Sequence, residues 1–187
     1  SPCGSIDATL RDTIKAEVLD RFIAGIKEDG IAYRGMLFPG LMLTKEGPKV
    51  LEFNCRWGDP ETQVLVRRLE SDLLPLLEAT AEGALSKVRP EWDTRAAVCV
   101  ILASGGYPGS YEKGKAIEGL EAAGRLEGVE VFHAGTKTVD GRVVTNGGRV
   151  LGVTALGANL AEARATAYGA ADRISFEGVQ RRNDIGG

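Results

Sequence analysis

One stretch, residues 49–63, constrains the fold more than any other part of the sequence. Val50, Leu51 and Phe53 are apolar and closely spaced, a pattern that predicts a strand packed against a core. Residues 58–60 read Gly-Asp-Pro, a composition typical of a tight turn. The stretch is therefore predicted to be a buried strand that ends abruptly, so the chain must build a sheet around it.

Two polar residues of this strand form the first candidate site. Glu52 and Asn54 are two positions apart, and side chains at that spacing share one face of a strand. A carboxylate and an amide oxygen side by side are ligands that Mg²⁺ accepts, usually together with substrate phosphates. The alternative is that both are ordinary solvent-facing residues of a half-buried strand.

Further charged residues follow the strand. Arg56 continues the same face if the strand runs that far, and Asp59 and Glu61 flank the end of the turn. A tight turn would bring these side chains into one small volume. The spacing alone predicts a candidate metal or anion site and does not decide between the two.

Composition and charge exclude several classes of protein. The chain has 187 residues and a net charge of −3, which gives no electrostatic signal for nucleic acid. It has no apolar run long enough for a membrane span. Its cysteines, Cys3, Cys55 and Cys99, are few and odd in number, which favours a reducing cytoplasm over a disulfide framework. A Cys–His nucleophile using His133 is a minor alternative.

The first half of the sequence predicts helices and one hairpin. Asp7 is a predicted N-cap for a helix over residues 8–27, which Gly30 ends. Apolar runs at 35–44 and 49–54 flank a turn and predict an antiparallel hairpin.

A helical pattern over residues 62–83 follows the hairpin. Pro75 divides it into two pieces, and Ser71 is the predicted cap of the second. The mixed charge and Pro90 of residues 87–95 are typical of a linker. We therefore predict domains at 1–88 and 89–187.

The second half alternates short strands with turns and ends in a helix. Asn159 caps this helix, which runs to about Arg173, with Glu162 at the capping-box position. The predicted strands are residues 96–103, 129–132, 136–139, 142–145 and 149–154. Strands and helices segregated in this way predict an α+β fold. The Gly-rich loop at 104–109 is as consistent with a structural turn as with a ligand loop.

Several segments resemble one enzyme family. The sequence LEFNCRWGDPETQ at residues 51–63 is similar to the metal-ligand segment of the phosphoribosylamine–glycine ligase (glycinamide ribonucleotide synthetase) family of the ATP-grasp superfamily. Further similar segments, in the same order, lie at residues 33–37, 68–74, 103–109, 132–136, 146–154 and 184–186.

This resemblance covers only the C-terminal portion of the family. It implies the C-terminal lobe of an ATP-grasp unit, with its metal-binding hairpin and helices, at 1–88. A small, mainly antiparallel β domain with one long helix follows at 89–187. The chain opens without methionine, at Ser1-Pro2-Cys3-Gly4, so we expect a missing N-terminal part and an inactive chain in isolation.

The resemblance also implies a reaction. Members of the family use ATP and Mg²⁺ (or Mn²⁺) to join glycine to 5-phosphoribosylamine in purine biosynthesis. The products are glycinamide ribonucleotide, ADP and phosphate, and the intermediate is glycyl phosphate. The implied partners are these substrates and the missing N-terminal part, with no nucleic acid and no membrane.

Roles for the candidate residues follow from the same resemblance. Glu52 and Asn54 would hold the metal. Arg56 would steady phosphate charge, and Asp59 and Glu61 would orient substrate amines or support the metal ligands. Many ATP-grasp enzymes carry another acidic ligand on the first hairpin strand, and residues 38–41 contain none.

A second candidate site lies in the second half. Gly147, Gly148 and Arg149 form a turn whose glycines are predicted to need positive φ. Backbone amides beside a guanidinium suit a phosphate. The resemblance implies a substrate, 5-phosphoribosylamine, that carries one, so we expect Arg149 to help bind the phosphoribosyl phosphate. The alternative is that Arg149 is a solvated strand residue.

Two other functions stay open. The chain could be a non-catalytic, partner-binding or regulatory domain derived from an ATP-grasp enzyme. It could also belong to a different ATP-grasp ligase or carboxylase, although the resemblance between residues 104 and 149 disfavours this.

Overall fold

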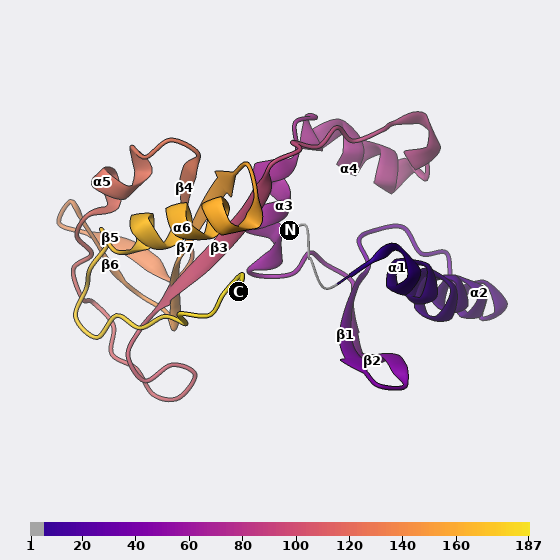
Figure 1. Ribbon diagram of the computed structural model, residues 1–187, viewed down its shortest axis with the longest axis horizontal. Helices are drawn as coiled ribbons and strands as arrows, with labels where there is room; N and C mark the ends of the chain where they lie inside the picture. The colour runs from indigo at the N-terminus through magenta and orange to yellow at the C-terminus, as the bar shows by residue number, and fades with distance from the viewer. Residues whose placement is uncertain (1–5) are drawn as a thin grey trace. The chain divides into compact units, whose positions relative to one another are not determined.

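The computed structural model describes residues 6–187 (Figure 1). The chain forms two compact units. We call residues 6–58 and 71–90 the hairpin unit, and Asp59–Glu70 with Glu91–Gly187 the core unit. The chain thus passes into the core unit at Asp59 and returns to the hairpin unit at Ser71. It enters the core unit again at Glu91, within the predicted linker. The domain boundary at 88/89 remains a prediction, and residues 1–4, which suggested a missing part, lie outside the described range.

One long helical segment opens the hairpin unit, as its apolar spacing predicts. It consists of α1 (Ala8–Ile14), the π-helical turn η1 (Lys15–Asp20) and α2 (Arg21–Glu28). Asp7 caps it as predicted, because its Oδ1 accepts a hydrogen bond of 2.8 Å from the Leu10 amide. The π-helical turn has no counterpart in the sequence prediction.

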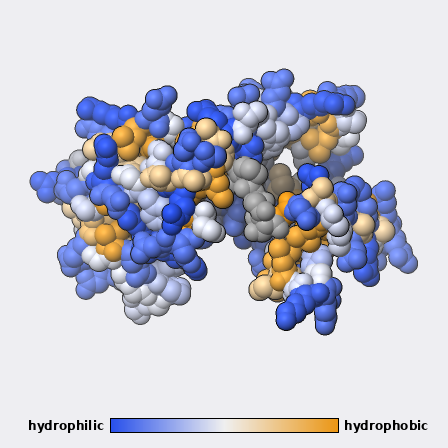
Figure 2. Space-filling view, viewed as in Figure 1, coloured by the Kyte–Doolittle hydropathy of each residue, from blue (hydrophilic) through white to orange (hydrophobic). Residues whose placement is uncertain are grey.

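The predicted hairpin is confirmed, but its predicted burial is wrong. Strands β1 (Phe38–Thr44) and β2 (Gly47–Asn54) pair antiparallel. Val50, Leu51 and Phe53 are nevertheless exposed, and Figure 2 shows a hydrophobic area over the hairpin. The apolar pattern marks strand faces suited to packing, but two strands cannot cover both faces of their own sheet.

Two shorter elements complete the hairpin unit. Helix α4 (Leu73–Glu82) begins at Asp72, whose Oδ1 accepts from the Leu74 amide at 3.0 Å, and η2 (Leu85–Lys87) is a 3₁₀ turn. The predicted cap at Ser71 is therefore wrong by one residue, because the aspartate next to it reaches the free amide. Pro75 lies in the first helical turn, where its missing N–H breaks no helical bond.

A three-stranded antiparallel sheet is the centre of the core unit. Its order is β3 (Ala96–Ala103), β7 (Arg149–Gly157) and β4 (Val129–His133). A second hairpin pairs β5 (Thr136–Val139) with β6 (Arg142–Thr145). These strands confirm the predicted ones. Asp140 and Gly141 both have positive φ in the β5–β6 turn, as an Asp-Gly hairpin requires.

Helices pack against the β3–β7–β4 sheet. Helix α6 (Leu160–Ala171) contacts β3, β7 and β4 (Figure 1). Asn159 caps it as predicted, with Oδ1 accepting from the Glu162 amide at 2.9 Å. Helix α3 (Glu61–Arg68) packs on β3 and β7, and α5 (Leu120–Gly124) lies against β4. The predicted α+β class is confirmed.

A β-bulge in β7 changes which face of the sheet Arg149 is on. Leu102 pairs with Leu151, but the next residue of β3, Ala103, pairs with Arg149, so Val150 is an extra residue in the ladder. Leu151 and Leu102 belong to the core under α6. The extra residue reverses the alternation, which turns Arg149 toward the face that carries α3.

Helix length gives one further observation. No helix within residues 6–187 is both long and apolar enough to cross a bilayer.

Candidate functional site

Glu52 and Asn54 lie together at the end of β2. Asn54 Nδ2 donates a hydrogen bond of 2.9 Å to Glu52 Oε1, so the two side chains share a face as their spacing predicts. On β1, Gly40 stands opposite Glu52, and a Cβ at that position would come within 3.0 Å of Glu52 Cγ. Strand β1 therefore carries no acidic side chain opposite Glu52, and Gly40 leaves that space to the Glu52 side chain.

The chemistry of this pair fits a hard divalent cation. A carboxylate and an amide supply oxygen ligands, which Mg²⁺ and Mn²⁺ prefer. The Asn54 amide would turn its Oδ1 toward the ion in place of its present bond to Glu52. Among residues 6–187, no group of three or more His, Cys, Asp or Glu side chains gathers in a metal-binding arrangement. Most of the coordination shell would therefore come from nucleotide phosphates and water.

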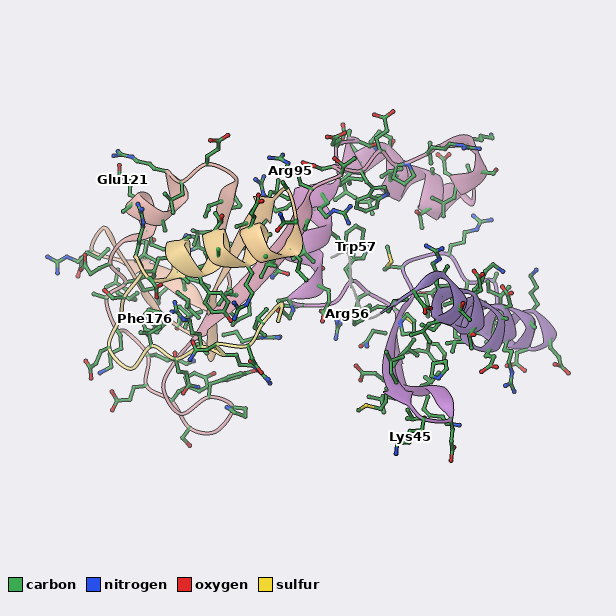
Figure 3. All side chains as sticks on the ribbon, viewed as in Figure 1. Lys45, Arg56, Trp57, Arg95, Glu121 and Phe176 are labelled. Carbon is green, nitrogen blue, oxygen red and sulfur yellow. The ribbon has the colours of Figure 1, made fainter. Side chains whose placement is uncertain are left out.

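The other residues of the motif divide between the two units. Arg56 follows β2 in the hairpin unit, is exposed, and donates from Nη1 to the Trp57 carbonyl at 3.0 Å (Figure 3). Asp59 and Glu61 belong to the core unit, and Glu61 is the first residue of α3. That all five predicted residues come together in one small volume therefore remains a prediction.

The structure joins Asp59 to the second candidate site. Arg149 Nη1 donates to the Asp59 carbonyl at 2.8 Å, and Arg149 Nη2 lies 3.1 Å from Asp59 Oδ2. The two residues are ninety positions apart and belong to the same unit. Arg149 is thus held by an ion pair while its side chain is 38% exposed, and both its role as a phosphate seat and the solvated-residue alternative stay predictions.

The turn before Arg149 corrects one prediction. Gly147 and Gly148 do not have positive φ. Space is the reason for glycine here: a Cβ on Gly148 would lie 2.1 Å from the Tyr107 ring, and one on Gly147 would lie 2.9 Å from Gly135 Cα. The glycines allow close approach of neighbouring chain segments.

Two supporting residues were missed by the sequence analysis. Ser104 donates from its amide to the Gly148 carbonyl and from Oγ to the Gly147 carbonyl, both at 2.8 Å. Gln63 donates from Nε2 to Asp59 Oδ1 at 3.0 Å. The Gly-rich loop at 104–109 was noticed in the sequence, but no local pattern connects Gln63 with Arg149.

The cysteines give no support for a nucleophile. Cys99 is buried, and burial raises the pKa of its thiol to about 11, with the nearby charges of Asp59 and Glu61 adding to the shift. It therefore stays protonated at neutral pH. Cys55 is an exposed free thiol, His133 is hydrogen-bonded to Thr136 Oγ1, and Cys3 lies outside the described residues.

Comparisons with known proteins identify the class of the chain. Residues 1–62 match the family model "Phosphoribosylglycinamide synthetase, ATP-grasp (A) domain", and residues 97–187 match "Phosphoribosylglycinamide synthetase, C domain". An ATP-grasp segment followed by this C domain defines the C-terminal portion of an ATP-grasp ligase. The chain belongs to the phosphoribosylglycinamide synthetase family, also called the phosphoribosylamine–glycine ligases.

Individual relatives agree with the family models. A phosphoribosylamine–glycine ligase from Caldanaerobacter subterraneus subsp. tengcongensis is 50% identical over 99% of this chain and 44% of the relative. One from Pseudomonas aeruginosa is 50% identical over 100% of this chain and 43% of the relative. The crystal structure of the Thermotoga maritima phosphoribosylamine–glycine ligase is 37% identical, with a TM-score of 0.81 over 98% of this chain and 44% of that chain. The chain thus spans less than half the length of these relatives.

Proposed function

We propose that this chain is the C-terminal part of an ATP- and Mg²⁺-dependent ligase that joins glycine to 5-phosphoribosylamine. The relatives that match almost the whole chain carry that name. The observation that carries the proposal furthest is the Glu52–Asn54 pair, whose side chains meet at 2.9 Å on one face at a strand end. In this proposal the protein works in the cytoplasm.

The chemistry assigns a task to each group. A glycine carboxylate oxygen attacks the γ-phosphorus of ATP and ADP leaves; the phosphoribosylamine nitrogen then attacks the carbonyl carbon and phosphate leaves. Mg²⁺ or Mn²⁺, when bound, would neutralise the charge on the phosphate oxygens. Glu52 and Asn54 would hold that ion, and Arg56 would offer a cation to the phosphate being transferred.

The core unit supplies the proposed seat for the second substrate. Arg149 has five N–H donors, and Asp59 engages one on each of its Nη atoms. The remaining donors can bind the phosphate of 5-phosphoribosylamine bidentately. Asp59 and Glu61 would support this region or orient the substrate amine. Because the chain spans less than half of its relatives, we expect the isolated chain to be inactive.

Substitution of the paired ligands tests the metal role. In the full-length ligase, Glu52→Ala and Asn54→Ala should each lower turnover by roughly 10- to 100-fold at limiting Mg²⁺, by analogy with losses of metal-supporting groups. The melting temperature should change little, because both side chains lie at the surface. Mg²⁺ titrations of the rate and of nucleotide binding measure this effect.

Glu46→Ala is the matched control, because Glu46 is an exposed carboxylate of the same hairpin. Turnover that stays at the wild-type level at limiting Mg²⁺ in both site variants would contradict the metal role. That result would favour a non-catalytic domain derived from the same fold.

Substitution of Arg149 tests the phosphate seat. Arg149→Ala should raise the apparent KM for 5-phosphoribosylamine by roughly 10- to 100-fold, the range for a lost hydrogen bond to a charged group. The KM values for ATP and glycine should stay nearly constant. Arg142→Ala, at an exposed position of β6, is the control, and an equal rise for all three substrates would rule out a specific phosphate role.

A further inference from the structure

Gln63 occupies an unusual position beneath the proposed phosphate seat. It lies in the first turn of α3, and its Nε2 donates to Asp59 Oδ1 at 3.0 Å. Gly152 of β7 lies next to its side chain, because a Cβ there would be in ordinary contact with Gln63 Cγ at 3.7 Å. Its other polar atom, Oε1, is buried and has no hydrogen-bond partner within the described part of the chain.

This arrangement is a poor way to stabilise a fold. A buried acceptor without a partner carries a desolvation penalty comparable to or larger than the gain from one hydrogen bond. A methionine would fill the same space without a buried polar atom to satisfy. The hydrogen bond that the Gln63 amide does make goes to Asp59. Its contribution is therefore to hold that carboxylate in place.

Asp59 in turn fixes the guanidinium of Arg149. Gln63 engages Oδ1, Arg149 Nη2 lies beside Oδ2, and Arg149 Nη1 binds the Asp59 carbonyl. With both carboxylate oxygens occupied, rotation of the Asp59 side chain would break at least one bond. The guanidinium plane is therefore set by two contacts on one residue, and that residue is held from the other side by Gln63.

We infer that Gln63 is a positioning residue that orients Arg149 through Asp59 for an anionic substrate group. This inference rests on the proposed function of Arg149 as the seat for the phosphate of 5-phosphoribosylamine. Gln63 itself touches neither the substrate nor the reacting atoms. It restricts the Arg149 guanidinium, which contacts the phosphate in this proposal. That restriction lowers the entropy lost when the phosphate binds.

Gln63→Met in the full-length ligase separates positioning from stability. The apparent KM for 5-phosphoribosylamine should rise about three- to tenfold, the effect expected for one lost hydrogen bond. The melting temperature should be equal to or higher than that of the wild type, because the unpartnered Oε1 is removed. Gln180→Met is the matched control: it removes a bond of 2.8 Å to the Tyr107 carbonyl and should leave this KM unchanged.

A double-mutant cycle shows whether Gln63 acts through Arg149. In an Arg149→Ala background, Gln63→Met should have no further effect on the KM for 5-phosphoribosylamine. Where Arg149→Ala does raise this KM, an unchanged KM in the single Gln63 variant, or an equal rise in both backgrounds, would overturn the inference.

A second measurement keeps this inference separate from the proposed function. If Arg149→Ala leaves the KM unchanged, the phosphate role fails, and nitrogen NMR of the guanidinium decides the positioning claim by itself. Faster rotation of the Arg149 guanidinium in Gln63→Met than in the wild type supports positioning. Equal rotation rates in the two proteins refute it.

Discussion

Both units of this chain contain apolar strands, but their interiors are very different. The core unit buries a continuous cluster between its sheet and α6, in which Val100, Leu151 and Val153 are completely buried. In the hairpin unit the buried apolar side chains among the described residues are Val18, Pro48 and Ala79, whereas Leu51 is 65% exposed. An apolar pattern therefore predicts that a face needs a cover, but it does not say which segment provides the cover.

This difference has an energetic meaning. Burial contributes roughly 25 cal/mol for each Å² of apolar surface removed from water, and the hairpin unit removes little. Ring contacts such as that of Phe22 with Phe53, at 4.8 Å between centroids, support it locally. We therefore expect the core unit to carry most of the stability of the chain. The same kind of substitution should change the free energy of unfolding by different amounts in the two units.

The largest difference is expected for leucine-to-alanine substitutions. Leu151→Ala should destabilise the core unit by about 2–5 kcal/mol, because it leaves a cavity in a completely buried site. Leu51→Ala should change the free energy of unfolding by less than about 0.5 kcal/mol, as is usual at exposed positions. Denaturant unfolding of both variants measures the contrast, and similar losses would show that the hairpin unit has a core of its own.

Glycine-to-alanine substitutions should have opposite signs in the two units. Gly148→Ala places a methyl group against the Tyr107 ring and should cost about 1–3 kcal/mol. Gly25→Ala, in α2 with no atom within 4 Å of the new Cβ, should stabilise by about 0.5–1 kcal/mol. Thermal melting compares them; if Tyr107→Ala fails to relieve the Gly148→Ala loss, the assigned clash is wrong.

The smallest effect is a pH dependence confined to the core unit. Hydrogen bonds from the Arg95 side chain and amide lower the pKa of Asp93. The stabilisation is present above the ordinary value of about 4 and is lost as the pH falls through the lowered pKa. Asp93→Asn should lower the melting temperature at pH 7, and the gap should close in stronger acid.

Asp12→Asn is the control for this prediction, since Asp12 is an exposed carboxylate of the hairpin unit. A gap for Asp93→Asn that is equally large at pH 7 and pH 2 would mean that the carboxylate charge does not contribute.

Local signals explain what could be predicted from the sequence. Asp7 and Asn159 were predicted as caps because a short polar side chain can reach a free amide within three residues. The Asp140-Gly141 turn was predicted because few residues tolerate its backbone. At Asp72 the same logic applied, but two adjacent residues could serve and the sequence did not decide between them.

Contacts between distant segments explain the rest. The pairing of Glu52 with Asn54 needed only the strand period, so it was predicted. The link from Arg149 to Asp59 crosses ninety positions and depends on how α3 packs on β7, which no local pattern encodes. The role of Gly148 was missed for the same reason, because the ring that excludes a side chain comes from Tyr107.

The bulge at Val150 lets β7 hold one more residue than β3 requires while Arg149 keeps its direction toward α3. With Val150 present, a strand without the bulge would turn Arg149 toward α6, where its charge would meet the apolar core. Deleting Val150 would instead place Arg149 directly before Leu151, still opposite Ala103 and facing α3. Replacing Val150 with another β-branched residue would keep the register and the direction of Arg149. A deletion would remove a completely buried valine of the core, so we expect it to lower the stability of the core unit while the direction of Arg149 is kept.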